Sequence, residues 1–584
     1  MIRPTHSQSE MKNLFLSFLL LPVIVMAALL LRFNAFDLLK TKNTAPNSIA
    51  LCGPVPALEV RAATNGKYIS AMPGWGNYSY PVSTKRDSVQ FYFNQGLTMY
   101  YSYHMKESLA SFQEAARLEP ECAMAYWGQA LAMGPYYNAA HLYKKPETIP
   151  AVLKQMNQFK DSANQKEQAL IAVMNQRYSA DAADADRKAL NVVYADKMHE
   201  LIAQFPEDQD IKMLFVDAVM LIHAWDFWNN DGTPKTWTNE VVTLSEKVLK
   251  ENPNHPAALH YHIHLTEASR NPEVALPNAD KLRDQLPGVA HMVHMSSHEY
   301  ERNGFFLKGV DVNDRADAAL LQYDSLAKNL GLVKHSPHYF AVQTYCAMSA
   351  GLYKTGMRAA NRLRKSVAPV YENPYDQYLF MLPELTLVRL GKWEEILKDT
   401  TKLDPKWTYA ALLRNFTRGI AYVNTGAGNK AKAELSALLE KAKDPILTKR
   451  RVPFNSFTPI ANIAGEILTA AIAFEDKKYD ETMASLNKAI EIEDGLIYTE
   501  PNDWPIPARQ FLGAYLLKMN KPAVAEKIYR EDLVWNPGNG WSAIGLSQSL
   551  KAQQKTKELA RIESGYKRSF SAAEQLPTGS VFLR

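Results

Sequence analysis

Histidine is concentrated in one part of this chain. Of the 14 histidines, nine lie between residues 255 and 338, and three of them fall within LHYHIHLTE at 259–267. His260, His264 and Glu267 are spaced i, i+4, i+7, which would place them on one face of a helix, whereas His262 would point the other way. Imidazoles and a carboxylate on one helical face are typical of a transition-metal site or a catalytic site.

The same spacing returns one repeat later, in AHMVHMSSHEYERNG. His294, His298 and Glu301 repeat the first triplet, His291 precedes them on the same face, and His338, in KHSPHYF, aligns with His291 in a later helix. The sequence therefore predicts eight metal ligands: His260, His264, Glu267, His291, His294, His298, Glu301 and His338.

This set of ligands indicates which metals would bind. Neutral imidazoles with one or two carboxylates suit zinc, copper, nickel or iron, whereas calcium and magnesium prefer oxygen. If such an ion kept an open position, it would lower the pKa of bound water, and Glu267 could act as the catalytic base. The HExxH order of many zinc hydrolases is absent. Two other interpretations stay open: a polar groove that binds a peptide or small acid through His and Arg, and purely structural histidines.

Helical repeats would have to position these side chains. From Val89 onward, apolar residues recur at helical spacing between Gly, Asn-Pro and Asp-Pro, with no convincing alternation of period two. Gly96 and Pro120 have the same separation as Gly513 and Pro537, with an aromatic and an alanine between them at the offsets of a tetratricopeptide repeat (TPR). The sequence predicts an all-α fold, a TPR-type α-solenoid in which roughly ten to thirteen helical hairpins stack into a right-handed superhelix with a concave groove.

The register within a repeat predicts which face the histidines occupy. With Pro287 at the closing position, both triplets fall at repeat positions 5, 9 and 12, which face the concave groove in TPR proteins generally. Leu259, Ala275 and Tyr300 occupy packing positions instead. Because neighbouring helix axes would be about 8–10 Å apart, equivalent imidazoles lying side by side could share one ion.

An uncharged apolar stretch lies near the N-terminus. Residues 14–31 (LFLSFLLLPVIVMAALLL) lie between Lys12 and Arg32, a length at the lower limit for a membrane-spanning helix that also fits a secretory signal. Apolar residues after the best cleavage candidate, Ala27, favour an uncleaved anchor. We expect a transmembrane signal-anchor at 1–40, an irregular linker at 41–88, and the solenoid at 89–584 with its His-rich groove at 255–340. The protein is thus expected to be membrane-anchored or exported, with its soluble part in the periplasm.

Other chemistries have little support. The chain has 66 Lys and Arg against 61 Asp and Glu and no basic run interleaved with aromatics, so no nucleic-acid partner is expected. Three widely spaced cysteines form no zinc ribbon, and catalytic or nucleotide-binding loops of known type are absent. Trp225, Trp228 and Trp237, around an NNDG turn, are expected to pack within a loop rather than to line a pocket. Three isolated histidines are expected to be exposed: His104, His141 and His199.

Four blocks of sequence carry a resemblance to a known group: FNQGL with SFQEAARLEPECAMAYWGQALAMGP, AWDFWNNDGTPK, LHYHIHLTEAS and GVAHMVHMSSHEYERNG. On these blocks, the chain resembles a broad group of bacterial TPR proteins over roughly residues 75 to 360. Glu301 is outside the shared pattern, and Ala125 stands where relatives often have a second cysteine near Cys122. The resemblance implies the fold and the site rather than an activity. The residues that match are His260, His264, Glu267, His291, His294, His298 and Arg302.

These observations predict an envelope-associated TPR protein with a transition-metal site in its groove, acting as a metal-dependent enzyme or in metal storage or delivery. The alternative is a TPR scaffold that binds a protein or peptide partner in the groove without metal or catalysis. The expected partners are therefore a metal ion, the membrane through the N-terminal helix, and a protein or peptide.

Overall fold

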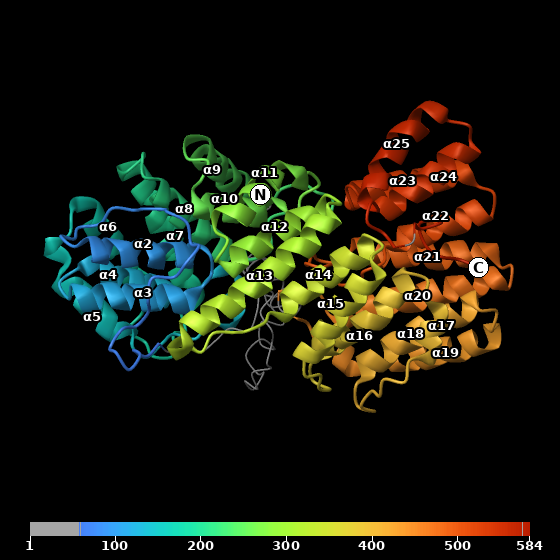
Figure 1. Ribbon diagram of the computed structural model, residues 1–584, viewed down its shortest axis with the longest axis horizontal. Helices are drawn as coiled ribbons and strands as arrows, with labels where there is room; N and C mark the ends of the chain where they lie inside the picture. The colour runs from blue at the N-terminus through green and yellow to red at the C-terminus, as the bar shows by residue number, and fades with distance from the viewer. Residues whose placement is uncertain (1–57, 59, 452, 575) are drawn as a thin grey trace, which may run out of the picture. The chain divides into compact units, whose positions relative to one another are not determined.

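The computed structural model describes residues 58, 60–451, 453–574 and 576–584, so the apolar stretch at 14–31 lies outside the described residues. Within that part, the only β-structure consists of two isolated bridges, and the all-α prediction is confirmed (Figure 1). One described helix, α20 (Phe457–Glu475), is long and apolar enough to cross a membrane, but 67% of its most apolar window is buried. We therefore treat α20 as a core helix.

The helices follow one another along the chain, and Figure 1 labels them in this order. The first half contains α2 (Asp87–Tyr101), α3 (Met105–Leu118), α4 (Ala123–Ala132), α5 (Ile149–Gln158), α6 (Gln165–Gln176), α7 (Arg187–Gln204), α8 (Gln209–Ile222), α9 (Thr238–Glu251), α10 (Pro256–Thr266), α11 (Leu276–Gln285), α12 (Ala290–Arg302) and α13 (Phe306–Leu326). The second half contains α14 (Pro337–Ser349), α15 (Tyr353–Ser366), α16 (Pro374–Arg389), α17 (Trp393–Lys398), α18 (Thr408–Asn424), α19 (Gly428–Lys441), α20, α21 (Tyr479–Asp494), α22 (Ala508–Lys518), α23 (Pro522–Trp535), α24 (Gly540–Ala552) and α25 (Thr556–Ser569). Short 3₁₀ helices lie at Tyr137–Leu142, Lys160–Ser162, Pro272–Ala275, Lys328–Leu330 and Pro445–Thr448.

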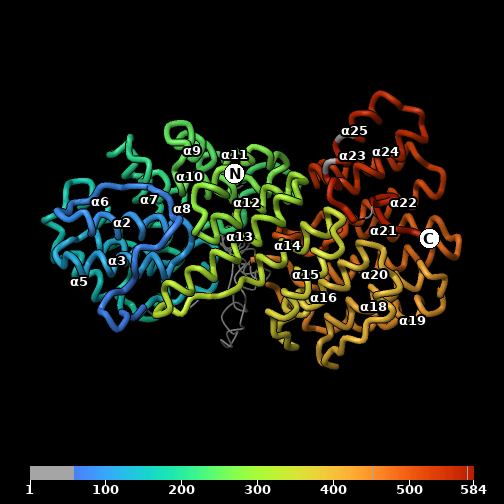
Figure 2. The backbone as a smooth tube through the Cα atoms, in the orientation of Figure 1, coloured from blue at the N-terminus to red at the C-terminus, as the bar shows by residue number. Residues whose placement is uncertain are grey.

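Helices with even numbers form one layer of the stack. Contacts join α2 to α4, α4 to α6, α8 to α10, and then each even-numbered helix to the next even one up to α24. Most odd-numbered helices pack against the even-numbered helices before and after them in the chain, which makes a series of antiparallel hairpins (Figure 2). This is the stack of helical hairpins that the repeat pattern predicts. The helices α10, α12 and α14 are three successive members of the even layer.

The residues behind the sequence repeat are packing residues. A Cβ atom placed on Gly96 of α2 would lie 2.9 Å from the Phe112 ring of α3, and one on Gly128 of α4 would lie 2.3 Å from it. Tyr529 occupies the same place between two glycines, Gly513 and Gly545, of α22 and α24. In both repeats one aromatic ring of an odd helix thus fills the space between two even helices, which can approach it only because they carry glycine there.

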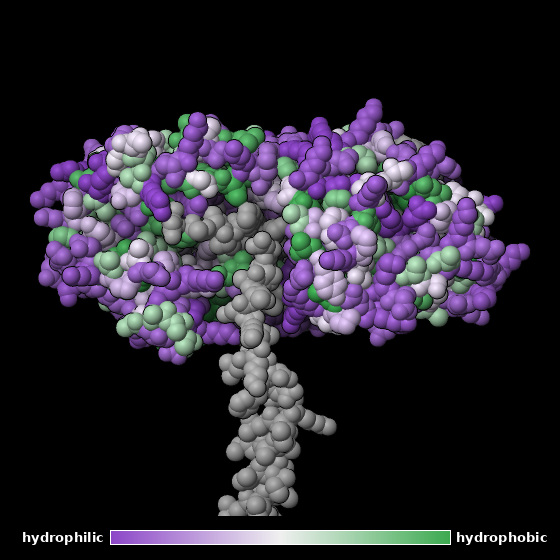
Figure 3. All heavy atoms as spheres, turned by 90° about the horizontal axis from the view of Figure 1, so that it is seen from below, coloured by the Kyte–Doolittle hydropathy of each residue, from purple (hydrophilic) through white to green (hydrophobic). Residues whose placement is uncertain are grey.

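Residues 60–86 contain no helix, yet several of them are buried against the stack. Ile69, Met72 and Trp75 are 3%, 4% and 7% exposed and join the apolar cluster that also contains Leu259 and Tyr300. Ile69, Met72 and Trp75 therefore belong to the core. The face drawn in Figure 3 is mostly hydrophilic, with small hydrophobic areas.

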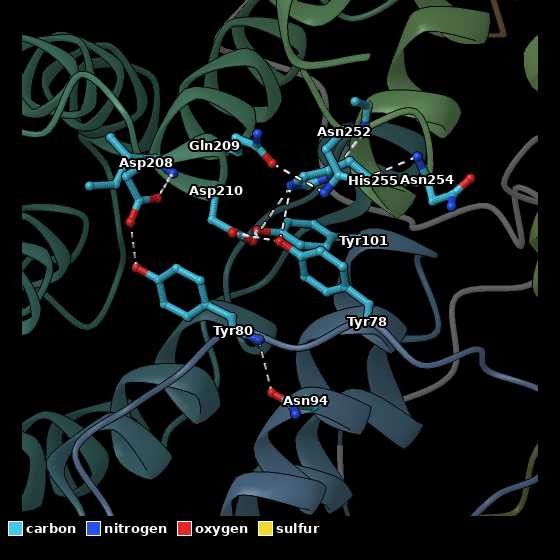
Figure 4. A network of polar contacts seen from close by, with 12 residues as sticks. Tyr78, Tyr80, Asn94, Tyr101, Asp208, Gln209, Asp210, Asn252, Asn254 and His255 are labelled. Atoms are coloured by element: carbon cyan, nitrogen blue, oxygen red, sulfur yellow. Dashed lines mark hydrogen bonds and ion pairs between the residues drawn. The ribbon is translucent and has the colours of Figure 1, made fainter. Parts of the chain in front are cut away.

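A buried polar network fixes the beginnings of α8 and α10 against α2 (Figure 4). The Asp210 carboxylate accepts hydrogen bonds from Tyr78 Oη at 2.5 Å and from Tyr101 Oη at 2.7 Å. His255, the N-cap of α10, lies with Nε2 3.1 Å from Tyr78 Oη. Burial alone would raise the pKa of Asp210. The hydrogen bond and charge of His255, together with the hydrogen bonds of Tyr78 and Tyr101, lower this pKa below its usual value. The network therefore holds a buried carboxylate beside the helix that carries the first histidines.

Candidate metal centre

Two successive even helices bring three histidines together. His260 and His264 lie one turn apart on α10, and His291 is the second residue of α12. One ring nitrogen from each lies within 4.8 Å of the others, and all three side chains are buried. We call these residues the first ligand group.

The next pair of even helices repeats this arrangement. His294 and His298 lie one turn apart on α12, and His338 is the second residue of α14. Their nitrogens also lie within 4.8 Å of one another, and all three side chains are buried. We call these residues the second ligand group. Like the first, it takes two histidines from one even helix and one from the start of the next even helix.

The stacking departs in part from the expected alignment. We expected equivalent residues of the two triplets to lie side by side, and His264 and His298 do so, with ring centroids 6.4 Å apart. His260, however, lies with Nε2 3.1 Å from Nε2 of His291, three residues before its equivalent His294. The shift between packed helices depends on how their side chains interdigitate, which the repeat period alone does not determine.

A third ligand group includes a residue that sequence reasoning missed. Glu267, His298 and Glu500 each place one ligand atom within 4.8 Å of the others. Glu500 lies in the segment between α21 and α22, far along the chain from Glu267, in the unremarkable sequence TEPNDW. No spacing or motif marks this glutamate, because only the folding of the array brings it to the histidines.

Hydrogen bonds orient several of the imidazoles. The Nδ1 atom of His260 lies 2.6 Å from the Tyr101 carbonyl oxygen, that of His264 lies 2.9 Å from Glu267 Oε1, and that of His294 lies 2.6 Å from Asn313 Oδ1. Since each acceptor is an oxygen, we assign the proton to Nδ1, which leaves Nε2 as the basic nitrogen. Metal-binding histidines in proteins are commonly oriented in this way.

Buried nitrogens without hydrogen-bond partners are concentrated here. They include Nε2 of His264 and His294 and both ring nitrogens of His298 and His338. Each buried polar atom left without a partner costs free energy, so such a concentration calls for an explanation. A cation bound by these nitrogens would supply one.

Burial determines the protonation of these groups. It lowers the pKa of His264 and of His294 to about 3. Burial, strengthened by neighbouring imidazoles, places the pKa of His260 well below its usual value, and the same causes act on His291, His298 and His338. The six imidazoles are therefore neutral at pH 7, the form that binds metals.

The carboxyl groups are shifted in the opposite direction. Burial raises the pKa of Glu267 to about 8 and that of Glu500 well above its usual value. Without a cation nearby, Glu267 is mostly protonated at neutral pH, and burial favours the protonated form of Glu500 as well. A divalent cation would favour their ionised forms because opposite charges attract strongly in a buried site.

Aromatic rings enclose the first two groups. The Tyr103 ring lies 4.7 Å from the His260 ring, Tyr137 lies 5.0 Å from His264, and Tyr339 stacks on His294 at 4.1 Å. We had expected the histidines to line an open groove. They are buried instead. The turn after α2, where Tyr103 has φ of 57°, supplies part of this enclosure.

Some predicted residues lie elsewhere. Glu301 is buried on α12, but its carboxylate belongs to none of the three groups among the described residues, and it lines a small cavity with Phe306 and Tyr345. His262 faces away from the groups and contacts Asn278 at 2.9 Å.

One histidine that we expected to be exposed is buried. His104 is 8% exposed, its Nδ1 lies 2.8 Å from Glu107 Oε1, and its Nε2 accepts a hydrogen bond from the backbone N–H of His291. The prediction was wrong because α12 packs against the start of α3, a contact between residues 187 positions apart.

Two tryptophans line a cavity beside the third group, contrary to our expectation of loop packing. Trp225 and Trp228 contribute to the wall of a cavity of about 640 Å³, together with Ala268, which follows Glu267, and Tyr498, which lies close to Glu500 in the chain. Trp237 does pack within the loop, since its ring stacks on His223 at 3.7 Å. The third group therefore lies next to a space large enough for a small molecule.

The distances are compatible with metal coordination. Zinc binds imidazole nitrogen at about 2.0–2.1 Å, so two ligands of a tetrahedral ion lie about 3.4 Å apart. The His260–His291 pair, at 3.1 Å, is already near that value. Modest side-chain movements would bring the remaining nitrogens of either three-histidine group into range.

Comparisons with known proteins add little to this picture. No protein-family model matches the chain, and no curated protein matches it. Among solved structures, yeast Tom70 aligns with 82% of this chain and 93% of its own at 10% identity and a TM-score of 0.30. A human IFIT1 dimer with PPP-AAAA aligns with 84% of this chain and 92% of its own at 12% identity and a TM-score of 0.29. Cut9 in the APC/C Cut9–Hcn1 hetero-tetramer aligns with 84% and 97% at 10% identity and a TM-score of 0.26.

Proposed function

We propose that this protein binds transition-metal ions at the two three-histidine groups on α10, α12 and α14. The observation that carries the proposal is the set of neutral, buried imidazole nitrogens without hydrogen-bond partners. Three of the rings are oriented through Nδ1 by an oxygen acceptor, as expected for metal ligands. Zinc, copper, nickel and iron suit these ligands.

A metal-dependent enzyme, a hydrolase or an oxidoreductase, is the form of this function that we favour over metal storage. Three protein ligands leave a coordination position for water or substrate, and the cavity wall includes the neighbours of Glu267 and Glu500. An ion bound by three histidines would lower the pKa of a water molecule in its open coordination position. Glu267 is the candidate for a base, because a cation beside it would favour its ionised form.

We further propose that the protein is anchored in or exported across a membrane through residues 14–31, with its soluble part in the periplasm. The support is the uncharged apolar stretch between Lys12 and Arg32, which is just long enough to span a bilayer. Fractionation of cells that express the full chain, with protease added to intact spheroplasts, tests this part. Protection of the soluble part from the protease would contradict it.

The metal proposal is tested by elemental analysis of protein purified without an affinity tag. His264→Ala/His298→Ala removes one ligand from each of the first two groups and one from the third, while His199→Ala/His335→Ala changes two histidines outside them. We expect bound metal in the wild type and the control variant, and its loss in the first variant at unchanged helical circular dichroism. A wild type that takes up no transition metal, or equal metal in both variants, would contradict the proposal and leave the scaffold interpretation.

A further inference from the structure

The cavity beside the third ligand group is built from six separate parts of the chain. Its walls come from residues 224–235, from Ala268 and Arg270 after α10, from Arg302 at the end of α12, from Arg450 and Pro453, from residues 493–509, and from the end of α23. Exposed residues, including Asn229 and Asn230, lie at its edge. Its volume of about 640 Å³ is in the usual range for sites that bind small molecules.

Two arginines in its wall have no carboxylate partner among the described residues. Arg302, 8% exposed, donates hydrogen bonds to the carbonyl oxygens of Glu267 at 2.8 Å, Ser269 at 3.0 Å and Trp535 at 3.1 Å. Arg270 donates to the carbonyl oxygen of Asn230, and its guanidinium lies 3.5 Å from the centre of the Trp535 ring. Carbonyl oxygens satisfy donors but do not neutralise a positive charge. Neither guanidinium therefore forms an ion pair with a described residue, although the more distant charges of Asp494 and Asp231 also act on Arg270.

The acidic groups of the wall do not offset these charges. Asp494 is paired with Arg509 at 2.6 Å, Asp226 with Lys235 at 3.2 Å, and Asp503 with Arg451 at 3.1 Å. Asp532 accepts hydrogen bonds from Ser542 Oγ and, at 3.0 Å, from Asn536 Nδ2. Burial raises the pKa of Glu493 to about 8, so its carboxyl group is mostly protonated at neutral pH. Among these groups, positive charge is therefore in excess next to Arg270 and Arg302.

Aromatic rings occupy much of the remaining wall. Trp225, Trp228, Trp504 and Trp535 line the cavity, and Tyr498 lies beside Arg302. Flat apolar rings beside guanidinium groups are suited to a ligand that has both an anionic and an apolar part.

We propose that this cavity binds a small organic anion, a carboxylate or a phosphate ester, through Arg270 and Arg302, with the tryptophans contacting its apolar part. Arg302 also donates to the carbonyl oxygen of Glu267, so the bound molecule would lie beside the third ligand group. The anion is a substrate only if the protein is a metal-dependent enzyme, so this part of the inference rests on the proposed function. Arg270 and Arg302, which would bind the anion, are not metal ligands.

Tryptophan fluorescence provides the test, because four tryptophans line the cavity. The probes are benzoate and phenyl phosphate, and the neutral probe is benzamide. Arg270→Gln removes a partly exposed guanidinium that has one carbonyl partner, whereas Arg358→Gln removes an exposed one outside the cavity. We expect saturable binding of at least one of the two anions, about tenfold weaker in Arg270→Gln and unchanged in Arg358→Gln, because a charge-assisted hydrogen bond is lost only in the former.

The same titration on His264→Ala/His298→Ala separates this inference from the metal proposal. Anion binding that persists in this variant supports the pocket whatever the metal content, and a wild type without metal would then contradict only the metal proposal. The inference is overturned if neither anion binds saturably, if benzamide binds as tightly as the anions, or if Arg270→Gln binds them like the wild type.

Discussion

Replacing Glu267 with glutamine should stabilise the metal-free protein while weakening its binding of metal. The glutamine oxygen can still accept the hydrogen bond from His264 Nδ1, but the side chain no longer ionises. Glu267 is almost completely buried, at 1% exposure. The wild-type protein must therefore either bury a charge at this position or bind a proton to avoid doing so.

The size of the effect follows from the pKa of Glu267, which is 4.5 for the unperturbed group and about 8 in the folded protein. Because the folded pKa is raised, the contribution of this group to stability is fully present below pH 4.5 and is lost as the pH rises through 8. At about 1.36 kcal/mol for each pKa unit, burying Glu267 costs about 1 kcal/mol at pH 5, about 3 kcal/mol at pH 7 and nearly 5 kcal/mol at pH 9. Glu267→Gln should recover most of these amounts.

Denaturant unfolding of metal-free protein, prepared with a chelator, measures the difference at these three pH values. Glu481→Gln, at an exposed position on α21, is the control and should not change the pH dependence. With saturating metal the advantage of Glu267→Gln should shrink by about 1.4–2.7 kcal/mol, since loss of the carboxylate beside His264 should weaken metal binding by about 10- to 100-fold. The order should therefore reverse at pH 5 but not at pH 9. A difference between wild type and Glu267→Gln that stays constant from pH 5 to pH 9 would refute the reasoning.

Three further predictions concern the support of the site. Tyr101→Phe removes the hydroxyl that holds the end of α2 to Asp210. Because the Tyr101 carbonyl orients His260, metal affinity measured in a competition with a chelator should fall about tenfold, and an unchanged affinity would contradict this role. Gly304→Ala should destabilise the protein by about 3 kcal/mol in thermal unfolding, because its Cβ would lie 2.1 Å from the Gly538 carbonyl oxygen at φ of 74°. Gly66→Ala, at φ of 76° in open space, should cost only about 1 kcal/mol, and equal losses would refute the packing argument. Removing metal should lower the melting temperature of the wild type but not of the variant that lacks the two histidines, and metal at a thousandfold excess over Kd should add about 4 kcal/mol of stability.

The helical part of the fold could be predicted because its signals are local. Apolar residues at helical spacing predict helices, and the glycine and aromatic offsets predict how two even helices pack around one odd helix, as Phe112 does between Gly96 and Gly128. Helical spacing also correctly placed His260 and His264 on one face and His262 on another. These relations involve residues within about one repeat of each other.

What could not be predicted depends on contacts between distant parts of the chain. The contact between His260 and His291 depends on how the packed surfaces of α10 and α12 fit together and not on the repeat length. The burial of His104 and the positions of Glu500 and Arg302 beside the third group result from segments that meet only in the folded array. No periodic pattern in the sequence reports such contacts.

The position of Glu500 has a consequence for the order of events during synthesis. A ribosome completes α10 and α12 long before it reaches this glutamate, because α13 to α21 are made in between, and the last residues of a nascent chain are still inside the exit tunnel when they are added. Glu267 and His298 are therefore translated well before Glu500, the third member of their group. Completion of the third group is thus a late step of synthesis, and a chain that stops before residue 500 would lack one of its three ligands.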